Sequence, residues 1–221
     1  MTPHPLRAIL IAAAAAAAAL PALAQDSPWS VRAGVAAIRF SPDSTIELPT
    51  GVPVPGAAVG VKNNTAAALE IGYELAHDWT LRFAMGNPPT TTLSAAGTLP
   101  PAPTGTLGKI RYAPAMLTLT YGFGDLGPIR PYVGAGINYT WVMKETDGDI
   151  ARLKADNAWG SVLQAGFDVP LSRQWSLFFD ARKVFVKTQA RGVVPALGNV
   201  PGSARIKLDP AIYVVGVGYR F

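Results

Sequence analysis

The sequence predicts an all-β fold, an eight-stranded antiparallel transmembrane β-barrel with short periplasmic turns and long extracellular loops. Three observations point to it. Apolar side chains recur at every second residue along several segments, as they do on one face of a strand. Hydrophobic residues make up 49% of the 221 residues, yet beyond residue 24 no apolar run approaches the roughly 20 residues of a membrane-spanning helix. The connections between the alternating segments are short and long in turn, as in outer-membrane barrels.

The N-terminal segment MTPHPLRAILIAAAAAAAALPALAQ is typical of a secretory signal peptide. One cation, Arg7, precedes an apolar run over 8–20, and a small-x-small triplet ends at Ala24. We expect residues 1–24 to be removed and 25–221 to form the barrel. A membrane anchor is the alternative, but the run is shorter than the roughly 20 apolar residues that an anchor needs. The exported chain contains no cysteine, so we expect it to be stable without disulfides.

Eight segments alternate with a period of two, and each has close to the roughly 9 to 11 residues that a tilted membrane strand needs. In the third of them, for example, Trp79, Leu81, Phe83 and Met85 share one face. Aromatic residues concentrate near the segment ends, where the membrane interfaces would lie. An even number of strands also suits the closure of such a meander. The segments are 29–40, 65–76, 79–87, 110–123, 130–143, 157–169, 174–187 and 207–221.

The connections between these segments predict which side of the membrane each one faces. The short connections carry Asp, Gly or Pro, the residues of tight turns, and they lie at 76–78, 124–129 and 170–173. The long connections are rich in Pro, Gly, Thr and Ala, and they lie at 41–64, 88–109, 144–156 and 188–206. Short turns face the periplasm in outer-membrane barrels, so both ends of the barrel domain are expected there.

The last segment, DPAIYVVGVGYRF, carries the alternation to the final residue. Its odd-numbered positions from Tyr213 to Phe221 form an apolar face. A soluble sandwich would bury such a face as well, so alternation alone does not distinguish lipid from a protein core. A periplasmic lipid-binding barrel is a further alternative. It requires a polar exterior, the reverse of what Trp175, Tyr219 and Phe221 indicate.

Four segments resemble the outer membrane protein W (OmpW) family, which includes alkane-uptake proteins. They are WSVRAG (29–34), RPYVGAGINYT (130–140), AWGSVLQAGFDV (158–169) and LDPAIYVVGVGYRF (208–221). The similarity covers nearly the whole mature chain and is weakest in the long loops. It implies a barrel in the outer membrane of a Gram-negative cell, with a narrow apolar lumen that passes small hydrophobic molecules. It also implies that Tyr219 and Phe221 belong to the C-terminal signal read by the barrel-insertion machinery.

The other face of each strand points into the lumen, and strand direction gives the height of each residue. The upper half is expected to be apolar, lined by Ile38, Phe40, Ala68, Ala84, Val162, Val184, Val186, Ile212 and Val214. The floor is expected to be polar, formed by Arg32, Glu70, Glu74, Arg82, Gln164, Asp168, Asp180 and Arg220. Carboxylates and guanidinium groups at one level of so narrow a barrel should pair and plug it. We therefore expect passive uptake in which a hydrophobic solute enters from above and leaves sideways between strands. The alternative is that the lumen is simply a packed core.

Arg182 does not fit this division, because it points inward above the middle of its strand, in the zone expected to be apolar. Inward Ala84 is small where a bulkier aliphatic residue would fit. Two interpretations stay open. In the first, the two residues together widen the lumen and make it more cationic, which would favour amphipathic or anionic solutes. In the second, Arg182 pairs with Asp180 or a loop acid and does not change the selectivity of the lumen.

Basic residues are frequent at the expected upper rim, and the formal net charge of the sequence is +5. They are Lys62, Lys109, Arg111, Lys144, Arg152, Lys154, Lys183, Lys187, Arg191, Arg205 and Lys207. Phosphates of lipopolysaccharide and the outer-membrane lipid are the expected partners of such a rim. An ordinary solvated loop surface is the alternative. Nucleic acid is excluded as a partner, since the chain is exported and has no clustered basic helix.

The sequence offers little for catalysis. After removal of the signal peptide the remaining histidine is His77, in a tight turn beside Asp78. One histidine and no cysteine cannot form a transition-metal site, and Asp147 and Asp149 lack the remaining ligands of a calcium loop. We expect no enzymatic activity, cofactor or metal. The alternative to uptake is a non-conducting surface or structural barrel whose loops bind a host factor, phage or partner.

Overall fold

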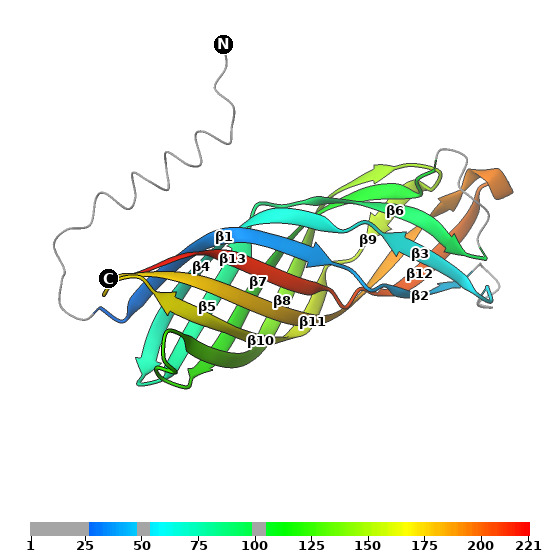
Figure 1. Ribbon diagram of the computed structural model, residues 1–221. Helices are drawn as coiled ribbons and strands as arrows, with labels where there is room; N and C mark the ends of the chain where they lie inside the picture. The colour runs from blue at the N-terminus through cyan, green and yellow to red at the C-terminus, as the bar shows by residue number, and fades with distance from the viewer. Residues whose placement is uncertain (1–26, 48–53, 99–104) are drawn as a thin grey trace, which may run out of the picture.

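The computed structural model describes residues 27–47, 54–98 and 105–221, which form a closed antiparallel β-barrel (Figure 1). Eight strands pair in the ring order β10-β8-β7-β5-β4-β1-β13-β11, and the pairing of β10 with β11 closes it. The predicted fold class is therefore confirmed. The predicted signal peptide, 1–24, lies outside the described residues. The ring strands are β1 (Trp29–Arg39), β4 (Asn64–Ala76), β5 (Trp79–Gly86), β7 (Gly108–Gly122), β8 (Arg130–Asp147), β10 (Ala158–Pro170), β11 (Trp175–Val194) and β13 (Ala211–Arg220).

The three short connections lie at the same end of the barrel as the chain terminus Phe221 (Figure 1). In the first, Asp78 adopts a positive φ of 69°, which allows β4 and β5 to be joined by a very short turn. In the second, Leu126 and Ile129 form an isolated bridge. The third closes where the backbone N–H of Leu171 donates to Trp175 O, 2.8 Å away. These turns keep successive strands in register at the periplasmic end.

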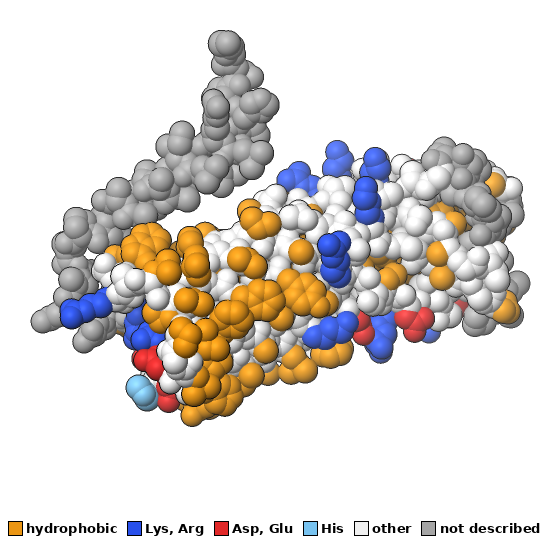
Figure 2. All heavy atoms as spheres, in the orientation of Figure 1, with side chains coloured by type: hydrophobic (Ala, Val, Ile, Leu, Met, Phe, Trp, Pro, Cys, Tyr) orange, Lys and Arg blue, Asp and Glu red, His pale blue; other side chains and the backbone are white. Residues whose placement is uncertain are grey.

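Large hydrophobic side chains point outward around the barrel wall, as the alternation predicted. Figure 2 shows them gathered as a belt on the half of the barrel nearest Phe221. Aromatic pairs lie across neighbouring strands, including Trp175 with Tyr219 at a centroid distance of 4.9 Å and Trp159 with Tyr139 at 4.6 Å. Exposing so many apolar side chains to water is unfavourable, whereas contact with lipid chains is favourable. The belt thus marks the membrane-spanning part of the wall.

The long connections expected to be loops form further strands, which extend the wall beyond the belt (Figure 1). Pairing with ring strands explains this difference, because β6 continues along β7 while β9 and β12 pair with the upper part of β11. The helical segment among the described residues is the short η1 (Pro195–Leu197), and no helix there is long and apolar enough to cross a membrane. The additional strands are β2 (Asp43–Glu47), β3 (Ala57–Val61), β6 (Thr90–Gly97), β9 (Ala151–Ala155) and β12 (Val200–Lys207).

The predicted last strand, 207–221, is wrong at its beginning. The structure places Lys207 in β12 and starts β13 at Ala211. Asp209 has a positive φ of 34°, and Pro210 has no N–H to offer to a ladder, so the chain bends between the two strands. The fourth predicted segment, 110–123, also begins earlier in the structure, because β7 extends upward to Gly108, which places Pro114 inside the strand.

Candidate functional site

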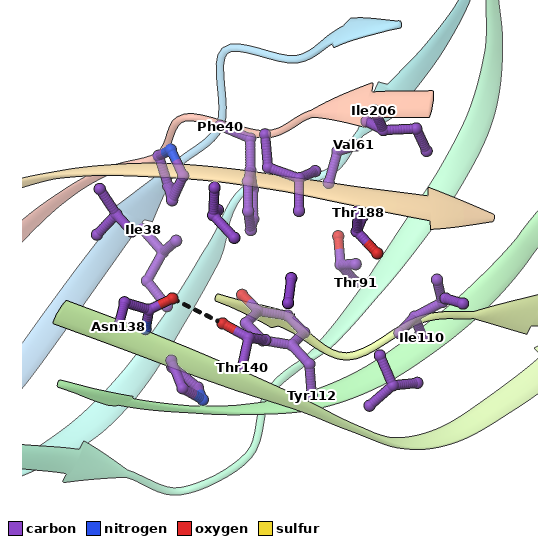
Figure 3. Close-up of a pocket in the computed structure, with 18 of the residues that line it drawn as sticks. Ile38, Phe40, Val61, Thr91, Ile110, Tyr112, Asn138, Thr140, Thr188 and Ile206 are labelled. Carbon is purple, nitrogen blue, oxygen red and sulfur yellow. Dashed lines mark hydrogen bonds between the residues drawn. The ribbon is translucent and has the colours of Figure 1, made fainter. Parts of the chain in front are cut away.

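A cavity of about 80 Å³ lies in the upper lumen, between the membrane belt and the extracellular extension. Figure 3 shows side chains converging on it from opposite walls, with Phe40 and Val61 on one side and Tyr112 and Thr140 on the other. The lining is mainly aliphatic and aromatic. The cavity therefore suits an apolar molecule better than a hydrated one.

Five residues predicted for the apolar upper half line this cavity: Ile38, Phe40, Val184, Val186 and Ile212. The other four pack in the same hydrophobic cluster rather than on the cavity wall. Ala84, Val162 and Val214 are buried within the cluster, and Ala68 packs against it. The predicted apolar residues thus form both the wall of the cavity and the packing around its lower end.

The polar groups of the cavity wall are already paired with protein. Asn138 is 1% exposed, and its Nδ2 donates to Ala115 O at 3.2 Å while its Oδ1 accepts from Thr140 Oγ1 at 3.0 Å (Figure 3). The hydroxyl of Tyr112 is hydrogen-bonded to the side-chain amide of Asn64, 3.2 Å away. A solute therefore does not need to form hydrogen bonds with these groups, and its binding free energy comes mainly from apolar contact.

The Tyr112 ring adds an aromatic surface to the cavity. It lies edge-to-face with Phe40, at a centroid distance of 6.2 Å and an interplanar angle of 72°. Neither Tyr112 nor Asn138 was named from the sequence. The alternation that places Leu117 and Leu119 outward also places the even-numbered residues of β7 inward, so Tyr112 and Met116 could have been found. Asn138 gave a weaker signal, because its inward neighbours on β8, Gly136 and Thr140, are not apolar side chains that would indicate a cavity wall.

Below the cavity, charged side chains from separate strands meet across the lumen. Glu70 lies near the centre, where Oε1 accepts from Arg82 Nη1 at 3.0 Å and from Arg32 Nη1 at 3.4 Å, and Oε2 accepts from Arg182. Arg32 also donates to Asp168 at 2.5 Å and to the Tyr132 hydroxyl at 3.0 Å. Among the described residues, three arginines and three carboxylates meet here, so the formal charges balance. They are Arg32, Arg82, Arg182, Glu70, Asp168 and Asp180.

Aromatic and amide groups complete the floor. The Arg32 guanidinium lies 5.1 Å from the ring centroids of both Tyr132 and Phe178. Asp180 is fully buried and accepts from the Tyr132 hydroxyl at 2.7 Å and from Gln164 Nε2 at 2.5 Å. Desolvating six charges costs several kcal/mol for each ion unless the ions pair well. This paired arrangement therefore forms a rigid barrier across the lumen.

Arg182 belongs to the floor rather than to the apolar zone. Its Nε donates to Asp180 Oδ1 at 2.6 Å, and its Nη2 donates to Glu70. Its Nη1 lies 3.9 Å from the sulfur of Met116, which lines the cavity above. The geometry favours the interpretation in which Arg182 pairs with Asp180. It also places Arg182 at the boundary between the floor and the cavity.

Glu74 and Arg220, also predicted for the floor, lie lower than the buried network. They form an ion pair with each other, and the Arg220 side chain is 51% exposed. Both line a polar pocket of about 150 Å³ at the periplasmic mouth, together with Arg32 and Asp168. These two residues thus contribute to the opening beneath the barrier rather than to the barrier itself.

The wall beside the cavity has an interrupted ladder between β5 and β7. The register of this seam stops at Met85–Ala115 and resumes with β6 at Thr90–Arg111. Between these pairs the N–H of Tyr112 donates to Pro89 O at 3.2 Å. Pro114 lies two residues further along β7 and so faces the same seam, but it has no N–H to donate. Since Tyr112 and Pro114 also line the cavity, the weakened seam adjoins it.

At other seams, side chains replace missing ladder bonds at a similar point, where ring strands leave the belt. Asn63 Oδ1 accepts from Phe40 N at 2.9 Å, and Asn87 Oδ1 accepts from Ala67 N at 2.6 Å. The backbone N–H of Val142 donates to Asn157 and that of Val186 donates to Asp209, at 2.8 and 3.2 Å. These side chains hold the wall together where the chain bends. The seam between β5 and β7 has prolines at the corresponding position.

The C-terminal aromatic residues lie at the closure of the barrel. The rings of Tyr219 and Phe221 are 5.0 Å apart edge-to-face, and Tyr219 also packs against Trp175. The N–H of Phe221 donates to Trp29 O at 3.2 Å. The C-terminus is therefore tied to the first strand of the ring.

Groups with catalytic chemistry are sparse in this structure. His77 Nε2 lies 3.6 Å from Asp78 Oδ1, and the His77 side chain is 95% exposed in its turn. No cluster of three or more metal-binding side chains occurs within 27–47, 54–98 and 105–221.

Comparison with known proteins agrees with this geometry. The family model described as the OmpW family matches residues 27–221. The dibenzothiophene metabolism operon protein PahQ of Pseudomonas aeruginosa is 38% identical over 203 residues, which cover 92% of this chain and 93% of PahQ. The crystal structure of the outer membrane protein OprG from Pseudomonas aeruginosa superposes with a TM-score of 0.80 at 25% identity, covering 89% of this chain and 97% of OprG.

The outer membrane protein AlkL is a further relative. AlkL of Ectopseudomonas oleovorans is 29% identical over 171 residues, covering 77% of this chain and 72% of AlkL. A structure of AlkL in DMPC lipid bilayers superposes with a TM-score of 0.67 at 26% identity, covering 91% of this chain and 95% of that one. The barrel described here is thus of a kind that resides in the outer membrane.

Proposed function

The chain belongs to the OmpW family, and we propose that this outer-membrane barrel mediates passive uptake of small hydrophobic molecules, which leave the lumen sideways into the membrane. The observation that carries the proposal is the position of an apolar cavity directly above a charge-balanced floor. A solute in the cavity has little reason to continue downward. It would have to disrupt paired buried charges, each of which costs several kcal/mol to leave unpaired.

The seam between β5 and β7 supports a lateral route. It adjoins the cavity, it lacks the donor of Pro114, and its register is interrupted from Met85–Ala115 to Thr90–Arg111. Separating strands there breaks fewer ladder hydrogen bonds than at a continuous seam such as that of β10 with β8. Met85, the last β5 residue in the ladder, is 47% exposed at the upper edge of the lipid belt, so an apolar solute leaving there would pass from cavity to lipid.

The solutes proposed are small, apolar and in part aromatic. Tyr112 and Phe40 face the cavity from opposite sides and give it aromatic surfaces on which a planar ring can pack edge-to-face. The relative PahQ is named for an operon of dibenzothiophene metabolism. Dibenzothiophene is an apolar aromatic compound with three fused rings, so it is a suitable first solute to test here. It is larger than the cavity of about 80 Å³, so its passage requires the cavity walls to separate.

Two partners accompany this function in the proposal. The upper rim carries basic residues such as Lys109 and Arg205, which suit the phosphates of lipopolysaccharide. Tyr219 and Phe221 lie at the barrel closure, where they suit recognition by the barrel-insertion machinery. No catalytic step, cofactor or metal is part of the proposed function.

A test of uptake compares outer membranes with and without this protein. Entry of dibenzothiophene and of a charged solute of similar size is measured, with Pro114→Val as the seam variant and Pro131→Val as the matched control in β8. We expect the protein to accelerate dibenzothiophene alone, and Pro114→Val, which restores a donor at similar volume, to remove most of this effect. Equal uptake with and without an inserted barrel would instead favour the non-conducting surface protein. Loss of uptake in both proline variants would argue against the lateral route.

A further inference from the structure

We propose that the outer surface of β10, β11 and β13 binds a phospholipid whose headgroup has a net negative charge, independently of solute uptake. The phosphate is placed at a lysine cluster formed by Lys183, Lys187 and Lys207. One acyl chain is placed in a groove directly below this cluster, on the lipid-facing side of the wall. The lysines take no part in the lumen site, whereas Gln164 and Arg182 contribute both to the wall of the groove and to the floor of the lumen.

The groove has a volume of about 300 Å³ and crosses three neighbouring strands. The strand register places Ala165 and Tyr213 on either side of Ala181, in one row across the wall. The row above it contains Leu163, Lys183 and Ala211. The short alanine side chains form the bottom of this groove on the outer surface. Leu163 and Tyr213, which are 55% and 45% exposed, form its edges. A groove of this shape provides apolar contact along the length of an acyl chain.

The lysine cluster carries more positive than negative charge. Lys183 Nζ donates to the backbone oxygen of Asp209 at 2.6 Å, and Lys207 Nζ pairs with the Asp209 carboxylate at 3.3 Å. Lys187 lies directly opposite Lys207 in the ladder between β11 and β12. Like charges in this position repel each other. Asp43 lies directly opposite Lys207 in the ladder between β12 and β2, so two carboxylates face the three ammonium groups and the formal charge of the cluster is +1.

The position of the cluster decides what kind of anion fits it. Lys183 lies next to Leu163 and Ala211 of the groove, so the positive charge and the apolar groove are continuous. Figure 2 shows Lys and Arg side chains beyond the end of the hydrophobic belt, which is where a membrane interface is expected. A soluble anion would use the lysines alone. A molecule with a phosphate at the interface and a chain within the belt matches both features.

The absence of cysteine from the sequence allows a direct test. Ala181→Cys, at the floor of the groove, is labelled with bimane, and the full barrel is reconstituted in phosphatidylcholine vesicles. Quenching is then compared between phosphatidylglycerol and phosphatidylcholine that carry a doxyl group on the acyl chain. We expect anionic doxyl lipid to quench at severalfold lower concentration, since each lysine near an anionic lipid surface contributes about a fivefold preference.

Two controls make the result specific. Lys183→Gln, Lys187→Gln and Lys207→Gln combined in the Ala181→Cys barrel should abolish the preference. A bimane at Leu119→Cys, on the lipid face of β7, should be quenched equally by both lipids in the otherwise unchanged barrel. Equal quenching by both lipids at position 181, or a preference that survives the triple substitution, would overturn the proposal. So would protection of position 181 from both lipids, which would mean that a second copy of the chain covers the groove.

Discussion

Arg182 and Glu70, which are 112 positions apart in the sequence, form an ion pair across the lumen. Their strands, β11 and β4, are separated in the ring by β13 and β1. Glu70 also accepts from Arg32 and Arg82, and Arg182 also donates to Asp180. This pair therefore connects two halves of the floor, and its loss should affect the whole barrel.

Arg182→Met should destabilise the barrel, because it leaves Asp180 and Glu70 with one cation fewer in a buried site. The expected loss in the free energy of unfolding is about 3–5 kcal/mol. Urea-induced unfolding from lipid vesicles, followed by tryptophan fluorescence, measures it. Arg220→Met is the matched control, since its pair with Glu74 is about half exposed and worth about 0–1 kcal/mol.

The double variant Arg182→Met with Asp180→Asn tests whether charge balance is the cause. Removing one charge of each sign restores neutrality, so the double variant should be more stable than Arg182→Met alone. A double variant that is less stable than the single one would show that packing of the Arg182 side chain, not its charge, stabilises the floor.

Val186→Trp should block the proposed uptake path by filling the cavity. Val186 is 5% exposed and lines the cavity, so a larger ring must enter the space of a solute. We expect entry of dibenzothiophene to fall to the level without the protein, with overpacking costing about 1–3 kcal/mol of stability. Val215→Trp is the control, because Val215 is 60% exposed on the lipid face. Unchanged uptake in a folded Val186→Trp barrel would place the path elsewhere.

The ring strands could be predicted from the sequence because each has one face in lipid and one in the lumen. Alternation with a period of two records that arrangement, as in Trp79, Leu81, Phe83 and Met85. The extracellular strands could not be predicted in the same way. Segments such as AAVGV in β3 are short and lack a contrast between faces, and they are held by pairing with strands that are distant in the sequence.

The sequence could predict which residues point into the lumen, but not which of them contact each other. The inward positions of Glu70, Arg82 and Asp180 follow from the alternation, and neutrality of a narrow lumen implies that they pair. The sequence does not say which acid meets which base, because the stagger of the strands decides this. The same stagger brings Arg182 down to the floor, although its height along the strand suggested the apolar zone.

Gly216→Ala should weaken closure of the barrel. Gly216 of β13 lies opposite Gly34 of β1, and a Cβ added at Gly216 would lie 2.1 Å from Ala33 O. The two backbones would have to separate where the first and last strands meet, at an expected cost of about 1–3 kcal/mol. Gly122→Ala provides the control, since its Cβ would lie 3.8 Å from Asp78 O. Equal unfolding midpoints for the two variants would show that the close approach at Gly216 relaxes without cost.

Phe221→Ser should separate a role in targeting from a role in stability. The Phe221 ring contacts Tyr219 alone among the ring pairs of the described residues, so its removal costs only about 0.5–1.5 kcal/mol of folded-state stability. If Phe221 belongs to the signal read by the insertion machinery, the variant should accumulate far less folded barrel in cells but refold normally into detergent micelles. Both quantities are measured by the heat-dependent shift of the folded barrel on a gel.

Val217→Ser, on the same outward face of β13, is the control and should insert in cells. A Phe221→Ser barrel that inserts in cells as well as Val217→Ser would remove Phe221 from the signal, whereas failure in micelles as well would assign it a structural role.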